Sequence, residues 1–143
     1  MNWFRALLLG LGALGATLTH AEQFQALGDH EVHYVVFPTT FLQAKVADQY
    51  GLTRGRDRAL VNISVLGPDG APVPATVTGR SENLLGQRQV LKFVEVKEDY
   101  AIYYLALLTH ADEEHHRIAI DVTLENGRSG EIRFTQKMYW ESS

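Results

Sequence analysis

Side chains that could bind a metal ion are densest in one stretch of the chain, residues 110–116. The stretch holds three histidines and three carboxylates. Neutral imidazoles and carboxylates are ligands of Zn²⁺, Ni²⁺ and Cu²⁺ in proteins. The pattern therefore predicts a candidate metal site made by His110, Asp112, His115 and His116.

A turn between two strands is a poor frame for such a site, because a metal ion needs several ligands that converge on one point. The spacing of the ligands in residues 110–116 matches no established ligand pattern. The alternative interpretation is a solvated, charged hairpin loop. On that interpretation the protein needs no cofactor.

Three arginines between positions 54 and 58 form a second candidate site. Arg54, Arg56 and Arg58 are separated by Gly55 and Asp57. The planar guanidinium group suits carboxylates and phosphates, and a glycine lets an anion approach the backbone. The three arginines are therefore a candidate partner-binding loop. The alternative is a solvated loop in which nearby acids balance the arginines.

The residues needed for nucleophilic catalysis are missing or badly placed. The chain has no cysteine. Ser129 lacks the flanking glycine pattern of a serine-hydrolase elbow, and no glycine-rich phosphate loop of the nucleotide-binding type occurs. We predict no catalytic residue, and we do not expect the protein to be an enzyme.

The elements that must position these residues are mostly β-strands. Alternating apolar residues, separated by turn residues, predict about seven strands, at residues 31–37, 60–66, 73–77, 89–97, 101–108, 117–124 and 131–140. With one short helix, this set is typical of an antiparallel immunoglobulin-like β-sandwich. A partly open barrel is the alternative.

The single helix is predicted after Pro38. Thr39 or Thr40 can cap its N-terminus, and Gly51 can take the left-handed conformation that ends it. Its apolar stripe consists of Leu42, Val46 and Tyr50. The run at 101–108 is apolar throughout, so we expect a central strand covered on one face by the sandwich core and on the other by this helix.

Two prolines bear on the order of the strands. Pro72 and Pro74 lie in and beside the strand predicted at 73–77. Proline cannot donate a hydrogen bond to a neighbouring strand. We therefore expect this strand at the edge of a sheet.

The N-terminus has the three parts of a secretory signal peptide. Arg5 precedes an uncharged apolar run at residues 6–18, and small residues stand before a cleavage point after Ala21. The run is shorter than the roughly 20 residues that a membrane-spanning helix needs. We expect cleavage to leave a single β-sandwich domain, residues 22–143, with no transmembrane segment.

The composition limits the partners that this domain can attract. The net charge is −4, with charges of both signs interspersed along the chain. Such a protein gains no bulk attraction to nucleic acid or to anionic lipid. Without cysteine it forms no disulfide, so the hydrophobic core must stabilise the fold.

Several short runs, taken in order, resemble the exported bacterial family catalogued as domain of unknown function 4426. These runs are VHYVVF at 32–37, FL at 41–42, VADQYG at 46–51, ALVNISV at 59–65, LGQ at 85–87, AIYY at 101–104 and FTQK at 134–137. The resemblance spans nearly all of the chain that follows the signal peptide. It implies a periplasmic location and no particular activity.

These observations together predict a non-catalytic periplasmic interaction or binding module. We expect its partner to be an envelope protein, with the loop of Arg54, Arg56 and Arg58 as the first surface to examine. The alternative function is a periplasmic metal-binding protein that uses the loop from His110 to His116.

Overall fold

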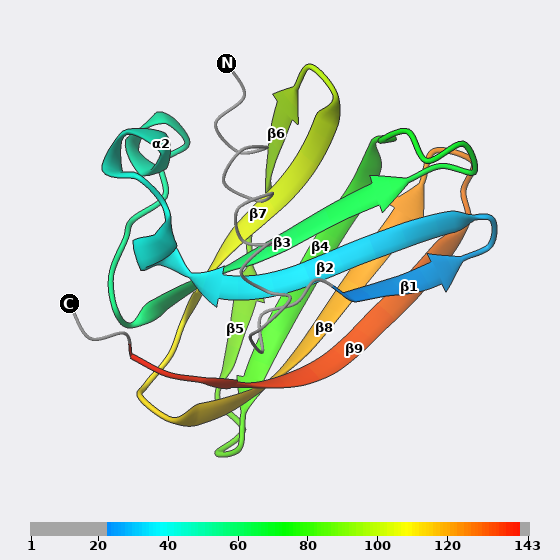
Figure 1. Ribbon diagram of the computed structural model, residues 1–143. Helices are drawn as coiled ribbons and strands as arrows, with labels where there is room; N and C mark the ends of the chain where they lie inside the picture. The colour runs from blue at the N-terminus through cyan, green and yellow to red at the C-terminus, as the bar shows by residue number, and fades with distance from the viewer. Residues whose placement is uncertain (1–22, 141–143) are drawn as a thin grey trace.

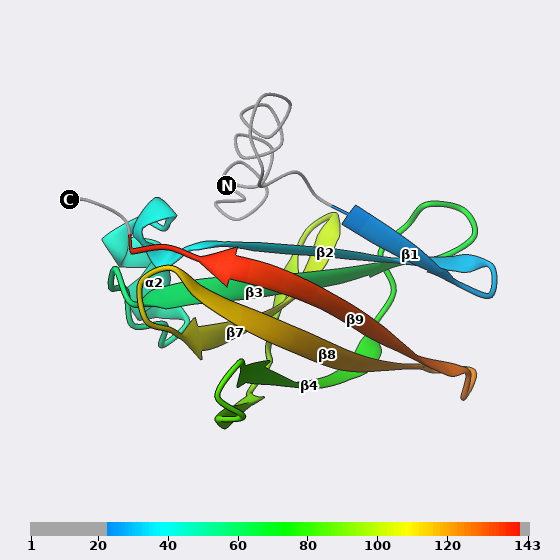
Figure 2. The same ribbon diagram turned by 90° about the horizontal axis from the view of Figure 1, so that it is seen from below.

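The strands of this protein form two antiparallel sheets packed face to face (Figures 1 and 2). The computed structural model describes residues 23–140. One sheet has five strands in the order β1-β2-β3-β7-β6, and the other has four in the order β5-β4-β8-β9. The predicted antiparallel β-sandwich is confirmed, with nine strands in this part of the chain.

In Figure 1 the colour runs along the chain from blue at its N-terminal end to red at its C-terminal end, and each strand carries its label. The five-stranded sheet contains β1 (Gln23–Leu27), β2 (His30–Pro38), β3 (Arg58–Leu66), β6 (Val94–Glu98) and β7 (Ala101–Thr109). The four-stranded sheet contains β4 (Ala75–Asn83), β5 (Arg88–Leu91), β8 (Glu114–Leu124) and β9 (Ser129–Met138). Between β2 and β3 lie a 3-10 turn, η1 (Thr39–Phe41), and a short helix, α2 (Ala44–Gln49).

The core lies between the sheets and is built from alternate residues of each strand. On β8 the inward positions are buried, and they are Ile118, Ile120, Val122 and Leu124. Together with facing residues of β3 and β7, among them Val61, Ile63 and Ala106, they form one hydrophobic cluster. This is the period of two that the sequence predicts for a sheet with one buried face.

A second hydrophobic cluster lies on part of the other face of the five-stranded sheet. The segment around α2 supplies Leu42, Val46 and Leu52, which pack with Leu60 of β3 and Leu105 of β7. The strand predicted at 101–108 is therefore buried on both faces, as expected. Figure 1 shows α2 beside one end of this sheet.

The predicted helix is shorter than expected, and the threonine cap is wrong. The helix α2 begins at Ala44, and no side chain caps it. The Thr39 hydroxyl instead accepts a hydrogen bond from the Gly55 backbone N–H at 3.0 Å and lies 2.9 Å from the carbonyl oxygens of Gly55 and Arg58. Gly51 does take the left-handed conformation, with φ of +66°.

Two predictions about individual strands are corrected. The strand predicted at 89–97 is two strands, because the chain leaves the four-stranded sheet after β5 and enters the five-stranded sheet as β6. The strand predicted at the edge, 73–77, begins only at Ala75. Since both prolines precede Ala75, β4 has all its N–H groups and lies between β5 and β8.

Candidate functional site

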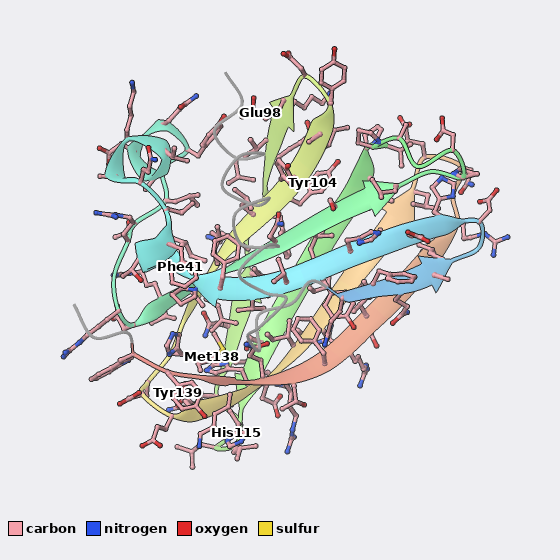
Figure 3. All side chains as sticks on the ribbon, viewed as in Figure 1. Phe41, Glu98, Tyr104, His115, Met138 and Tyr139 are labelled. Atoms are coloured by element: carbon pink, nitrogen blue, oxygen red, sulfur yellow. The ribbon has the colours of Figure 1, made fainter. Side chains whose placement is uncertain are left out.

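The segment with the candidate metal ligands joins the two sheets. It starts at His110, just after β7 of one sheet, and runs into β8 of the other. It is therefore a crossover between sheets and not the hairpin loop expected from the sequence. Figure 3 shows His115 at the end of the four-stranded sheet, where β8 begins.

His116 is buried and has both ring nitrogens in use. Its side chain is 2% exposed. Nε2 lies 2.6 Å from Oε1 of Glu114, and Nδ1 lies 2.6 Å from the Ser81 hydroxyl oxygen. Because a carboxylate only accepts, Nε2 must carry a proton. His116 therefore cannot bind a metal ion without losing one of these hydrogen bonds.

The neighbouring residues hold Trp140 in place. Nδ1 of His110 donates to the Ala111 carbonyl oxygen at 2.9 Å. The His110 carbonyl oxygen accepts from the Trp140 ring, and the Asp112 carboxylate accepts from the Trp140 backbone N–H. Across residues 23–140, no group of three or more histidines, cysteines or carboxylates is placed to hold a metal ion.

Ser81, His116 and Glu114 form a serine–histidine–carboxylate chain of hydrogen bonds. Such a chain can activate a nucleophile only if the hydroxyl reaches a substrate. The side chain of Ser81 is fully buried between the sheets. In this structure the chain of bonds therefore fixes the start of β8 against β4.

Glu114 is the centre of this network. Burial raises the pKa of its carboxyl, but hydrogen bonds from the Ala111 backbone N–H, His116 and Asn83 outweigh that effect, so the net pKa lies below its ordinary value. The bonds from Ala111 and Asn83 are both 3.1 Å long. The carboxylate thus ties the crossover segment to β4.

The three arginines of the candidate partner-binding loop contact other groups of the same chain. Arg54 donates to the Leu42 carbonyl oxygen at 2.7 Å. The Arg56 guanidinium lies over the Trp140 ring, 4.4 Å from its centroid. Arg58 lies 3.4 Å from the Asp57 carboxylate. Each of the three arginines therefore already has a structural contact.

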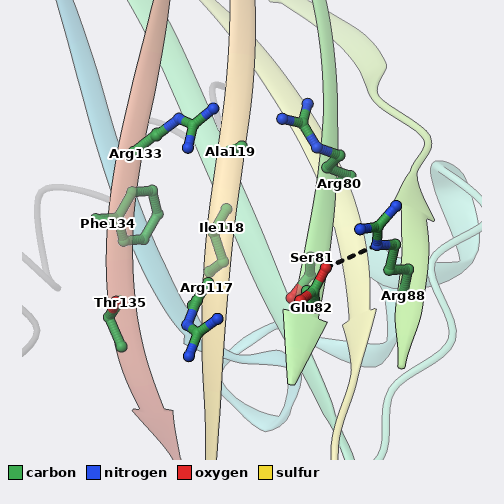
Figure 4. Close-up of a pocket in the computed structure, with 10 residues that line it drawn as sticks. All are labelled: Arg80, Ser81, Glu82, Arg88, Arg117, Ile118, Ala119, Arg133, Phe134 and Thr135. Atoms are coloured by element: carbon green, nitrogen blue, oxygen red, sulfur yellow. Dashed lines mark hydrogen bonds and ion pairs between the residues drawn. The ribbon is translucent and has the colours of Figure 1, made fainter. Parts of the chain in front are cut away.

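A different set of arginines lines a depression on the outer face of the four-stranded sheet (Figure 4). The volume of the depression is about 560 Å³. Its rim carries four arginines from four strands, which are Arg80 of β4, Arg88 of β5, Arg117 of β8 and Arg133 of β9.

The register of the strands explains the hollow. Ala119 of β8 lies directly between Arg80 and Arg133 on the two neighbouring strands. In Figure 4 the two guanidinium groups extend toward β8 from either side. Alanine leaves the space that a larger side chain would fill. The result is a small floor with long cationic side chains around it.

Three of these arginines have carboxylate partners and one does not. Arg80 lies 3.4 Å from Glu131, and Arg133 also pairs with Glu131. Arg88 lies 2.7 Å from Glu82. Within the described residues, the exposed guanidinium of Arg117 pairs with no carboxylate. Its charge is available to an anion from outside.

Sequence reasoning missed this surface as a site. The alternation of β9 indicates that Arg133 points outward, and the same alternation places Arg117 and Ala119 on the outer face of β8. The four arginines are spread over more than fifty positions of the chain. Only the pairing of β4 with β5 and β8, and of β8 with β9, brings them to one face.

Fold and site together define a two-sheet antiparallel β-sandwich with a cationic hollow on one outer face. The chain belongs to the family described as Domain of unknown function (DUF4426), whose model matches residues 24–141. The resemblance noted in the sequence is thus confirmed. The comparison with curated proteins found no match.

One solved structure supports this assignment, and two others share the fold. A DUF4426 family protein from Pseudomonas aeruginosa PAO1, PA0388, is 34% identical, with a TM-score of 0.78 over 85% of this chain and 97% of that one. FetP of uropathogenic Escherichia coli, expressed recombinantly in the E. coli periplasm, is 12% identical, with a TM-score of 0.64 over 86% of this chain and 97% of FetP. A copper-bound variant of FetP is 10% identical, with a TM-score of 0.61 over 85% and 97% of the two chains. At these identities the likeness to FetP is one of fold.

Proposed function

We propose that this protein is a non-catalytic binding module of the bacterial periplasm, and that it takes an anionic partner on the outer face of its four-stranded sheet. The observation that carries this proposal is the depression with four arginines on its rim, of which Arg117 has no carboxylate partner among the described residues. A guanidinium group binds carboxylates and phosphates through paired hydrogen bonds.

The periplasmic location is supported by the signal-peptide pattern of the sequence and by the fold that the protein shares with FetP, which was expressed in the periplasm. The predicted signal peptide, residues 1–21, lies outside the described residues. Among residues 23–140, no helix is long and apolar enough to cross a membrane.

The proposal is tested with inorganic tripolyphosphate as the probe. We expect the side-chain Nε–Hε signals of Arg80, Arg117 and Arg133 to shift when the protein is titrated in ¹H–¹⁵N NMR spectra. Arg117→Gln should weaken binding about fivefold, since one guanidinium–phosphate contact is lost. Arg128→Gln is the matched control, because Arg128 is exposed in the distant turn between β8 and β9.

Equal affinities of Arg117→Gln and the unchanged protein for tripolyphosphate would contradict the proposal. Signal changes confined to Arg54, Arg56 and Arg58 would instead move the binding site to the loop predicted from the sequence. That loop is the less favoured surface, since each of its arginines contacts its own chain, whereas Arg117 of the depression pairs with no carboxylate among the described residues.

Metal binding is the second candidate function, because the protein shares its fold with the copper-bound variant of FetP. Two histidines of the crossover segment support it. His115 is exposed, and the hydrogen bond to Ala111 leaves Nε2 of His110 as the nitrogen with a free lone pair. Binding of Cu²⁺ or Zn²⁺ tighter than micromolar, lost in His110→Ala/His115→Ala, would favour this function. Undiminished binding in that variant would exclude the loop as the site.

A further inference from the structure

Two adjacent leucines stand out from the end of the four-stranded sheet. Leu84 is 62% exposed and Leu85 is 83% exposed. Both lie in the turn between β4 and β5, where a tight loop ordinarily carries polar residues. Exposing two leucines side by side keeps apolar surface in water, which is unfavourable unless something covers it.

The turn is held in one conformation by the side chain of Asn83. Its Oδ1 accepts hydrogen bonds from the backbone N–H groups of Leu85 at 3.0 Å and Gln87 at 2.9 Å. Its Nδ2 donates to Gln87 and to Glu114. Gly86 adopts a φ of +81°, which other residues rarely take. The leucines are therefore presented on a preorganised tip, which loses little conformational entropy on binding.

This leucine tip, Leu84 and Leu85, adjoins the cationic depression. Asn83 pairs with His116, so the tip lies at the end of the sheet where β8 begins. Glu82 is flanked by Arg88 on β5 and Arg117 on β8. These two arginines are therefore two residues along the strands from the tip. Apolar and cationic groups thus meet at one end of the sheet.

The negative net charge of the chain does not cancel this arrangement. At physiological ionic strength the Debye length is about 8 Å, so charges on the far side of the molecule are largely screened. A charged partner in contact with this end of the sheet therefore interacts mainly with the charged groups that lie there. Among these, Arg117 has no carboxylate partner in residues 23–140.

We propose that the anionic partner is the surface of a membrane that contains acidic phospholipids, an inference that rests on the proposed function. The leucine tip enters the interfacial region of the bilayer, and Arg117 contacts a lipid phosphate. Arg88 lies beside this contact in its ion pair with Glu82. A convex tip fits a bilayer, which accepts an apolar protrusion without a complementary pocket. With only two leucines inserted, binding is weak and reversible.

Sedimentation with lipid vesicles tests the inference. The protein is expressed as the full chain and isolated from the periplasm, and mass spectrometry establishes that it starts at Glu22. It is then mixed with vesicles of phosphatidylethanolamine and phosphatidylglycerol at 3:1, or with vesicles of phosphatidylcholine alone. We expect binding to the anionic vesicles to be at least about tenfold stronger.

Two variants separate the roles of the two features. Leu84→Ser/Leu85→Ser should lower binding to the anionic vesicles about tenfold, and Arg117→Gln should lower it about fivefold. Val94→Ser and Lys45→Gln are the matched controls, since both residues are exposed on elements of the five-stranded sheet and its helix. Neither control should change binding.

Vesicle binding that persists in the double leucine variant overturns the inference. So does tripolyphosphate binding without vesicle binding, which would leave the proposed function standing with a soluble anion or an acidic protein as the partner. If the protein binds neither vesicles nor tripolyphosphate, the proposed function fails together with the inference.

Discussion

Single carboxylates and arginines in this protein take different roles according to their neighbours. Glu114 is surrounded by donors from the Ala111 backbone, Asn83 and His116, and its charge is used within the fold. Arg117 points away from the sandwich and pairs with no carboxylate among residues 23–140, so its charge can act on a partner. Both side chains belong to strand β8. Their roles therefore differ because their neighbours differ, and not because they lie on different elements.

Replacing Glu114 with glutamine should lower the stability of the protein at pH 7 by about 1–2 kcal/mol, because hydrogen bonds to a charged group are lost. The folded-state pKa of Glu114 lies below its ordinary value of 4.5. Its contribution to stability is therefore fully present well above pH 4.5 and is lost as the pH falls below 4.5 through the folded-state pKa. Urea unfolding at pH 7 and at about pH 3.5 measures this.

The difference in unfolding free energy between Glu114→Gln and the unchanged protein should shrink on acidification. Glu113→Gln is the control, since that side chain is 69% exposed and its one ion pair, to Lys137, is 3.9 Å long. A constant difference at the two pH values would mean that the Glu114 charge does not stabilise the fold.

At the scale of elements, the two sheets are joined by polar contacts as well as by the core. Tyr104 of β7 accepts a hydrogen bond from the Ala75 backbone N–H at the start of β4, at 2.9 Å. Its hydroxyl donates to Glu95 of β6 at 2.9 Å. Tyr104 therefore contacts the first residue of β4, immediately after the prolines of the preceding segment. Figure 3 shows Tyr104 on the five-stranded sheet.

Tyr104→Phe should destabilise the protein by about 1–2 kcal/mol at pH 7, since the Ala75 N–H loses its partner. Burial also raises the pKa of the Tyr104 hydroxyl to about 12 from 10.0. That group contributes stability below pH 10 and loses it as the pH rises from 10 through 12. The variant should therefore show a smaller loss of stability between pH 9 and pH 11 in thermal or urea unfolding.

The control for this prediction is Tyr139→Phe, because Tyr139 is 53% exposed. Its unfolding free energy should match that of the unchanged protein at both pH values. Equal behaviour of the two phenylalanine variants would show that the bond from Tyr104 to β4 adds nothing to stability.

At the scale of the whole molecule, the sandwich separates two kinds of surface. Part of the outer face of the five-stranded sheet is covered by the segment around α2, which packs with Phe37 and Leu105. The outer face of the four-stranded sheet carries the cationic depression. Figure 2 shows no helix among residues 23–140 that covers this face. This asymmetry leaves one broad face for a partner.

The full chain, produced in a bacterium, should be recovered from the periplasm with the mass of residues 22–143, because small residues precede the cleavage point after Ala21. Intact mass spectrometry of the periplasmic fraction checks this. A mass that includes Met1 would contradict both the signal peptide and the periplasmic location. A metal ion or a second protein retained under native conditions would identify a ligand directly.

The sequence by itself determined the features that depend on near neighbours in the chain. Alternation at residues 117–124 predicts which side chains of β8 face the core, and the Asn126-Gly127 pair predicts the turn that follows. Both are local, since side chains alternate along any strand and a turn needs only a few residues. The uniformly apolar run at 101–108 likewise predicts a strand buried on both faces.

Only the tertiary structure decided which strands pair and in what register. That pairing divides residues 89–97 between two sheets and places Arg80, Arg117 and Arg133 around Ala119. It also brings the ring of His116, a predicted metal ligand, within hydrogen-bond distance of Ser81. These outcomes depend on contacts between residues far apart in the chain, whose energies are not encoded in any local pattern.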